Sequence, residues 1–526
     1  MFLTKKSNFK EFITVLGIIF YAYYINRLSS AVGVMPIDSF GFFDTAFSIL
    51  KNKLPIRDFW IFTGLIVDYM GAFFLTVFGK NWASYVLHAS FMNIVASLSF
   101  YIFLNKINFN KIFAIFYTIS FATLCYPVSG TPFAYIHAYI FSLISIFFFI
   151  IAVKNNNFLS WFLIPIFCFM AFLSMQTPSA YIILIIFFLS IIHFVKHFDF
   201  KNVQFFVLGA FLSILIFILF LFFTKTPFIN FLYQYILFPL TIGEGRFSSN
   251  EMAYLGLIDQ LNIKRILGDF KFLHVFLVPL IFVAIRYRKK NKGYLNSFNL
   301  IIILSSFAFI FNQLLTANQI YIFSMIPLLA AVLHFNILKI DPSSKLVWLL
   351  IFIVLFASIK FHFRYNIDRK FHDLETIDKS KAIDAVAIDK NLKGLKWINK
   401  LNLDPLNEID SIKNALVVIK NDQRKKILIT HYQFISTILD EDLNILNRWY
   451  LWDNNTHPTE NHKYFEFYKS MVQKNVDKNK IQVIYLLGHD NEMMLKNIKN
   501  YFTNVCFKSK TLEEKRFSSH ELITCK

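Results

Sequence analysis

Residues 203–224 have the sequence VQFFVLGAFLSILIFILFLFFT, which contains no charged side chain. An apolar helix of roughly 20 residues crosses the hydrocarbon core of a bilayer. Ten similar segments lie before residue 362, at 11–34, 82–104, 111–126, 132–153, 158–175, 178–197, 271–288, 297–315, 319–338 and 344–361. The sequence therefore predicts a polytopic α-helical membrane protein with about 11 spans.

The composition of the chain supports this class and divides the chain in two. Its 526 residues are 56% hydrophobic, and the mean hydropathy is +0.51, more than a soluble protein can bury. The net charge of +20 comes largely from Lys and Arg between apolar segments, which is typical of loops facing anionic lipids and not of nucleic-acid binding. We predict a transmembrane domain at 1–361 and a soluble domain at 362–526.

The soluble region has the pattern of a small α/β domain. Strand-like runs at 426–430 and 483–487 alternate with helical spacing at 464–476 and 493–502, which predicts a small parallel sheet. If this domain lies outside the cytoplasm, Cys506 and Cys525 can pair, and we expect them within bridging distance.

The distribution of Lys and Arg predicts the topology. Cations that mark the cytoplasmic side are Lys5, Lys6, Lys10, Lys106, Lys111, Lys154, Lys196, Lys201, Arg286, Arg288, Lys289, Lys290, Lys339 and Lys345. This alternation places the N-terminus inside. It makes 35–81 and 225–270 outer loops of a multi-pass inner (cytoplasmic) membrane protein, with a periplasmic or extracellular C-terminal domain.

Segment 62–79 is apolar but a poor span. It carries Asp68 in its middle and three glycines, and counting it as a span would break the charge alternation. We predict an interfacial or re-entrant helix on the outer face, with Asp68 facing water or a reaction cavity.

The first outer loop combines one carboxylate with an amphipathic segment and later cations. Asp38 stands where the first span ends, and the following apolar face is expected to lie flat on the bilayer. That face consists of Phe40, Phe43, Phe47 and Leu50. Lys53, Arg57 and Asp58 follow it.

This arrangement suits a lipid-linked sugar donor, whose phosphate lies at the membrane surface. A carboxylate such as Asp38 can deprotonate an acceptor hydroxyl, and Lys53, Arg57 and Arg246 can bind the donor phosphate. We expect Asp38 to face a cavity at the outer membrane surface, with Arg57 or Arg246 within reach of one phosphate position.

The loop also resembles the first periplasmic loop of GT-C-fold glycosyltransferases, including lipid A aminoarabinose transferases and protein O-mannosyltransferases. The matching positions are Asp38, Ile49-Leu50, Asn52, Pro55, Arg57-Asp58-Phe59-Trp60 and Gly64. Residues 318–327 are similar to a later helix start of that family. The resemblance implies that Asp38 is the catalytic carboxylate. Asn52 replaces the usual Gly, and Ser39 replaces a frequent second acid, which argues against a paired-carboxylate metal site.

Other polar residues could line the site or have structural roles. Asp44, Asp58, His137, Gln176 and Glu244 are candidates for lining it. Asp44 is favoured as structural or ion-paired, and Asp58 as a partner of its neighbour. His137 is favoured as a structural histidine, and the glycines beside Glu244 suggest a turn.

Two motifs of the soluble region are expected to be structural. Asp440-Glu441-Asp442 matches the acidic motif of nucleotide-sugar enzymes only as an isolated tripeptide. The aromatic run 448–453 is expected to be core packing.

These observations predict a membrane glycosyltransferase that moves a sugar from a polyprenyl-phosphate donor to an acceptor hydroxyl on a lipid, glycan or protein. No cofactor is predicted, and a divalent metal is compatible with this chemistry but not indicated. The alternatives are a lipid-linked glycan flippase or transporter, and a non-catalytic envelope protein. Ionisable residues gathered in one outer loop favour the enzyme, because transporters place charges within spans.

Overall fold

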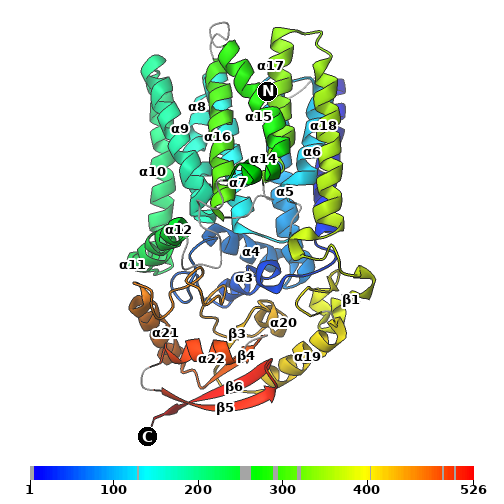
Figure 1. Cartoon of the computed structure of the whole chain (residues 1–526). Coiled ribbons are helices and arrows are strands. Elements are labelled where there is room, and N and C mark those ends of the chain that lie inside the picture. The colour runs from blue at the N-terminus through cyan, green and yellow to red at the C-terminus, as the bar shows by residue number, and fades with distance from the viewer. Residues whose placement is uncertain are drawn as a thin grey trace.

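The computed structural model describes residues 5–126, 129–248, 262–287, 294–316, 322–402, 404–488, 491–502 and 505–525. A helical bundle carries a C-terminal sheet domain at one end (Figure 1). The predicted cation cluster at 288–290 and residues 318–321 of the later family-like motif lie outside the described residues.

Each of the eleven predicted spans contains a helix. These helices are α1 (Lys5–Ser29), α5 (Trp82–Lys106), α6 (Lys111–Cys125), α7 (Ala134–Asn155), α8 (Phe158–Ser174), α9 (Gln176–Lys196), α10 (Phe200–Phe223), α15 (Lys271–Arg286), α16 (Tyr294–Thr316), α17 (Met325–Ile340) and α18 (Leu346–Phe361). Within the described residues, seven helices are long and apolar enough to cross a membrane, which is the pattern of a multi-pass membrane protein. The count of about 11 crossings stays a prediction.

The first bundle helices, α1, α5 and α6, alternate in direction relative to the C-terminal domain. Near the start of α1, Glu11 accepts hydrogen bonds from Tyr101 (3.0 Å) and Lys111 (2.8 Å), where α5 ends and α6 begins. Beyond the end of α1, the Gly33 N–H donates to the Lys396 carbonyl of the C-terminal domain at 3.0 Å. Glu11 therefore marks the end of the bundle away from the domain, and several predicted cytoplasmic cations lie at that end.

The first outer loop is packed between the bundle and the domain. It contains α2 (Pro36–Ser39), α3 (Phe43–Leu50) and α4 (Leu65–Phe78). Arg448 of the domain donates to the Thr63 carbonyl just before α4, and Lys80, just after α4, pairs with Asp440 at 2.6 Å. Because both ends of α4 contact the domain, α4 lies along it and does not run the length of the bundle (Figure 1), the geometry expected of an interfacial helix.

The prediction that the phenylalanine face of this loop lies on the bilayer is wrong. Phe40 packs against Phe434 (ring centroids 4.7 Å apart) and Phe43 stacks on Tyr85 (4.6 Å). Phe47 is also fully buried. The face is covered by α5 and the C-terminal domain, so a single apolar core joins bundle, loop and domain.

The described part of the second outer loop is helical. It contains α11 (Phe228–Phe231), the π-helical turn η1 (Leu232–Leu237), α12 (Phe238–Ser248) and α14 (Ile263–Asp269). The turn expected around Glu244 is therefore wrong, because both flanking glycines lie inside α12.

The C-terminal domain holds a four-stranded sheet of order β3-β4-β6-β5, formed by β3 (Lys426–Thr430), β4 (Val483–Leu487), β6 (Phe517–Thr524) and β5 (Val505–Glu513). Only β3 and β4 are parallel, and the other two pairings are antiparallel, so the sheet is mixed and not parallel as predicted. Its helices are α19 (Pro405–Asn421), α20 (Ile435–Leu439), α21 (Phe465–Asn479) and α22 (Asn491–Lys499).

Short elements connect the last bundle helix to this sheet. They are η3 (His362–Ile367), η4 (Lys370–His372), η5 (Lys379–Lys381), β1 (Ile383–Asp384), η6 (Ala385–Ala387), η7 (Lys390–Leu392) and β2 (Lys396–Trp397), with β1 and β2 antiparallel.

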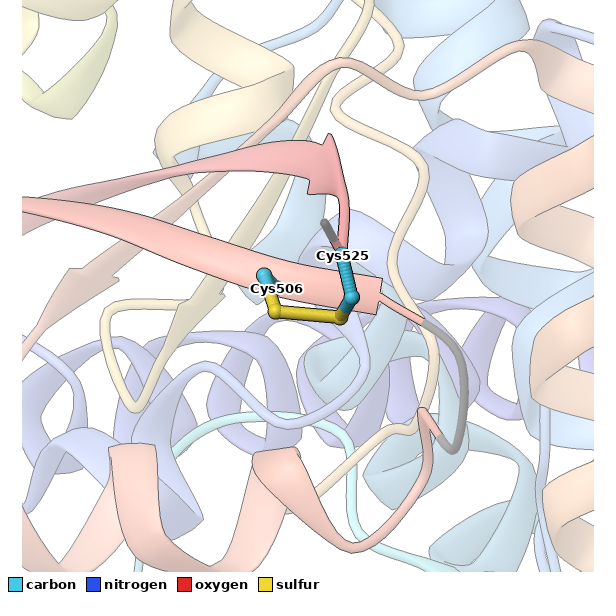
Figure 2. Close-up of a disulfide and its surroundings, with 2 residues drawn as sticks. All are labelled: Cys506 and Cys525. Atoms are coloured by element: carbon cyan, nitrogen blue, oxygen red, sulfur yellow. A yellow bond between two sulfur atoms is a disulfide. The ribbon is translucent and has the colours of Figure 1, made fainter.

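The terminal hairpin β5–β6 is closed by a disulfide. Figure 2 shows Cys506 at the start of β5 and Cys525 just after β6 joined by an S–S bond, with their Cα atoms 5.0 Å apart. The expectation that these two residues lie within bridging distance is confirmed.

Candidate functional site

Asp38 lies in the short helix α2, directly after the first bundle helix. Pro36 occupies the first turn, and the Met35 N–H donates to Ser39 Oγ at 3.0 Å, which fixes the turn that carries Asp38. The neighbouring Ile37 carbonyl accepts a hydrogen bond from Trp449 Nε1 of the C-terminal domain at 2.8 Å. Asp38 is therefore held where bundle and domain meet.

The Asp38 carboxylate has no partner within the part of the chain that the structure describes. It is partly exposed, and desolvation raises its pKa to about 6. A carboxylate with a pKa near 6 is ionised at neutral pH and still basic enough to accept a proton.

Asp44, by contrast, forms hydrogen bonds that hold the first loop to the C-terminal domain. Its carboxylate accepts hydrogen bonds from the backbone N–H groups of Ser436 (3.1 Å) and Thr437 (2.9 Å) and from Thr437 Oγ1 (2.7 Å). Burial raises its pKa to about 6 although these hydrogen bonds oppose the shift. Asp44 thus ties the first loop to the start of α20, in line with its favoured structural interpretation.

Asp58 is also paired. It accepts from Arg57 at 2.6 Å, from the Leu54 N–H at 2.9 Å and from Lys478 at 3.1 Å. Burial acts to raise the pKa of Asp58, but these hydrogen bonds outweigh it and hold the pKa below its ordinary value.

Asp68 does not face water or a cavity, so that prediction is wrong. It is fully buried, forms an ion pair with Arg448 and accepts from Thr45 Oγ1 at 2.6 Å. The guanidinium of Arg448 also lies over the Phe42 ring, 4.2 Å from its centroid. A buried carboxylate needs such a partner, and the C-terminal domain supplies it.

Gly64 makes room for this ion pair. Its φ is +73°, a conformation that favours glycine, and a Cβ there would meet the Phe42 ring and the Arg448 guanidinium. The glycine of the family-like motif therefore has a local packing role.

The two cations predicted for the donor phosphate in the first loop have protein partners. Arg57 donates to the carbonyls of Thr224 (2.9 Å) and Asn52 (2.8 Å) as well as to Asp58. Lys53 donates to the side chains of Asn444 and Asn479. Within the described residues, no hydrogen bond or ion pair joins Arg57 to Asp38.

The charged residues of the second loop lie on α12. Glu244 is 70% exposed and pairs with Lys463 at 3.5 Å. Arg246 lies near the phenol of Tyr181, which stands in the first turns of α9.

His137 and Gln176 are held by neighbouring groups. His137 is fully buried, with Nε2 3.0 Å from His88 Nε2 and Nδ1 2.8 Å from the Phe133 carbonyl, as expected of a structural histidine. Gln176 Nε2 donates to the carbonyls of Phe62 (2.7 Å) and Tyr235 (2.8 Å). Gln176 therefore joins the first loop to the second.

The two tail motifs have structural contacts, as expected. Asp440 pairs with Lys51 and Lys80, at 2.9 and 2.6 Å, and Glu441 pairs with Lys426 at 2.8 Å. Arg448 and Tyr450 of the aromatic run are buried.

Arg369 and His372 lie beside the Asp38 turn and were missed from the sequence. His372 Nε2 is 3.5 Å from Ser39 Oγ, and its Nδ1 is 3.0 Å from Arg369 Nη2. The sequence feature that could have indicated them is their position just after the last predicted span, at the same membrane boundary as Asp38.

Within the described ranges, no three His, Cys, Asp or Glu residues form a group that could hold a metal ion.

No family model matches the sequence, and no curated protein sequence matches it either. Among solved structures, the chain is similar to the archaeal oligosaccharyltransferase AglB from Archaeoglobus fulgidus, solved in complex with an inhibitory peptide and a dolichol-phosphate. The similarity covers 97% of this chain and 74% of that chain, at 9% identity and a TM-score of 0.41. A likeness this distant assigns no role to any residue.

Proposed function

We propose that this protein is a membrane glycosyltransferase that uses Asp38 as the base and a polyprenyl-phosphate-linked sugar as the donor. One observation carries the proposal: of the four carboxylates in the first outer loop, three have structural partners, and Asp38 has none among the residues that the structure describes. An unpaired, partly buried carboxylate at the membrane boundary has a cost in stability, which a catalytic role explains.

The proposed reaction is a single displacement at the anomeric carbon. Asp38 takes the proton of the acceptor hydroxyl as the acceptor oxygen forms a bond to that carbon. The bond between the anomeric carbon and the phosphate oxygen breaks, and its electron pair leaves with the polyprenyl phosphate.

The departing phosphate requires a cation. The candidates are Arg57 and Lys53 of the first outer loop and Arg246 of α12 in the second. The outer loops would then supply both the base and the cation.

Purified protein in liposomes containing a polyprenyl-phosphate sugar tests the proposal. Asp38→Asn should abolish transfer to an acceptor, whereas Asp440→Asn, which removes an equal charge from an exposed surface pair, should leave the rate unchanged. Neither variant should have a thermal unfolding midpoint below that of the parent, and Asp38→Asn should raise it slightly because it removes an unpaired, partly buried charge. Full activity of Asp38→Asn would refute the assignment, and donor translocation without transfer would favour the flippase.

A further inference from the structure

A cavity of about 990 Å³ lies at the end of the bundle away from the C-terminal domain. It is formed where α7, α9 and α15 end and α16 begins. One of its lining residues, Lys154, donates to the Lys106 carbonyl at the end of α5 at 2.7 Å, which fixes its position at this far end. The proposed transfer reaction does not use this cavity, because Asp38 lies at the opposite end.

The polar side of the cavity is basic. Lys154 and Lys196 line it together with the imidazoles of His193 and His197, whose ring centroids are 5.3 Å apart. Across the described ranges, neither lysine has an acidic partner. An anion entering the cavity would therefore meet unneutralised positive charge.

Among the described lining residues, the one carboxylate is that of Asp199, and it already has hydrogen-bond partners. It accepts hydrogen bonds from the Lys201 N–H at 3.0 Å and from Asn156 Nδ2 at 3.0 Å, and so caps the start of α10. Asp199 thus has a structural role in the helix cap, and the two lysines outweigh its single negative charge among the described lining residues.

The other side of the cavity is apolar and open at the bundle surface. Ile192 of α9, Leu300 of α16 and Ile285 of α15 line it and are 48%, 43% and 72% exposed. Tyr294 stands at the rim with Lys154 Nζ 5.7 Å from its ring centroid, and tyrosine prefers this headgroup level of a bilayer. A charged part and an apolar part in one cavity match a molecule with an anionic head and hydrocarbon chains.

We propose that this cavity binds an anionic membrane phospholipid. Its phosphate lies between Lys154 and Lys196, and its acyl chains lie along Ile192 and Leu300. Basic pockets between transmembrane helices recognise such headgroups through direct charge attraction, which is strongest where water is partly excluded.

Native mass spectrometry of the full chain in detergent, with added phosphatidylglycerol or phosphatidylcholine, tests this site. The parent should retain phosphatidylglycerol in preference to phosphatidylcholine. Lys154→Gln/Lys196→Gln should weaken retention of phosphatidylglycerol by about tenfold or more, since each lysine near the headgroup contributes to affinity. The control Lys10→Gln/Lys345→Gln removes the same charge from exposed positions outside the cavity and should bind as the parent does.

A second variant separates loss of the site from misfolding. Leu300→Trp narrows the apolar side without changing charge and should also reduce retention, at an unchanged elution volume in size exclusion. Equal retention of both lipids by the parent, parental binding by the double lysine variant, or full displacement by inorganic phosphate alone would overturn the proposal.

Discussion

At the scale of single residues, the four carboxylates of the first outer loop divide by their partners. Asp44, Asp58 and Asp68 hold the loop to the C-terminal domain or to neighbouring cations, whereas Asp38 remains available. The sequence singled out Asp38 from its place after the first span, and it favoured structural or pairing roles for Asp44 and Asp58. It could not indicate their partners in the C-terminal domain, or the burial of Asp68, because those partners are 380 to 420 residues away.

The raised pKa of Asp38 predicts the pH dependence of transfer. In the proposed reaction Asp38 acts in its ionised form, so the initial rate of transfer should rise with pH through about 6, where Asp38 loses its proton. Rates measured across this range in liposomes check the expectation. An ascending limb near pH 4, the ordinary value for Asp, would contradict it.

The buried pair of Asp68 and Arg448 predicts a large effect on stability. Arg448→Met leaves an uncompensated carboxylate in the core and should lower the free energy of unfolding by about 3–5 kcal/mol. Lys80→Met, which breaks an exposed pair with Asp440, should cost about 0–1 kcal/mol.

The matched double variant Asp68→Leu/Arg448→Met completes that experiment. It removes both charges and should recover much of the lost stability, because the loss comes from the unpaired charge. Thermal unfolding in one detergent measures all four proteins. Equal midpoints for Arg448→Met and the parent would show that the ion pair does not matter.

At the scale of elements, the first loop shows what a sequence pattern can and cannot predict. Charge alternation and Asp68 correctly indicated that α4 would not run the length of the bundle. The apolar face of Phe40, Phe43 and Phe47 was assigned to lipid, but it packs on protein. Helical periodicity shows that a face is buried, and it does not show whether lipid or another domain covers it.

The disulfide predicts a local effect on the terminal hairpin. Cys506 and Cys525 are 19 residues apart, and removing the bond by Cys506→Ser/Cys525→Ser should destabilise β5 and β6 by roughly 3 kcal/mol through the larger entropy of the open chain. Hydrogen exchange should rise in these strands and stay unchanged in α21. Uniformly unchanged exchange in the hairpin would contradict this role.

At the scale of the whole molecule, the bundle has two unlike ends. The C-terminal domain packs against one end (Figure 1), where Asp38 also lies, and Lys106, Lys111 and Lys154 lie at the other end. The division into bundle and domain followed from composition. The mixed sheet could not be predicted from the sequence, because the long hairpin strands β5 and β6 are largely polar and lack the apolar runs of β3 and β4.

These unlike ends predict how the protein is oriented. Alkaline phosphatase fused after Lys526 should be active, because the domain is expected outside the cytoplasm, and a fluorescent protein fused there should stay dark. Truncation after Ile340, followed by the same two fusions, should reverse both results. Cytoplasmic fluorescence of the full-length fusion would show that the predicted topology is inverted.

The packing of the first loop between bundle and domain also sets an order of events during synthesis. Asp44 leaves the ribosome 393 residues before its partner Thr437, and Lys53 leaves 426 residues before Asn479. At translation rates of about 5–20 residues per second, the loop waits on the order of 20–80 s before the domain covers the part of its apolar face that includes Phe40. The last third of the chain therefore completes a structure begun by the first tenth, and a nascent chain that stalls before residue 430 would leave that apolar surface open to chaperones and proteases.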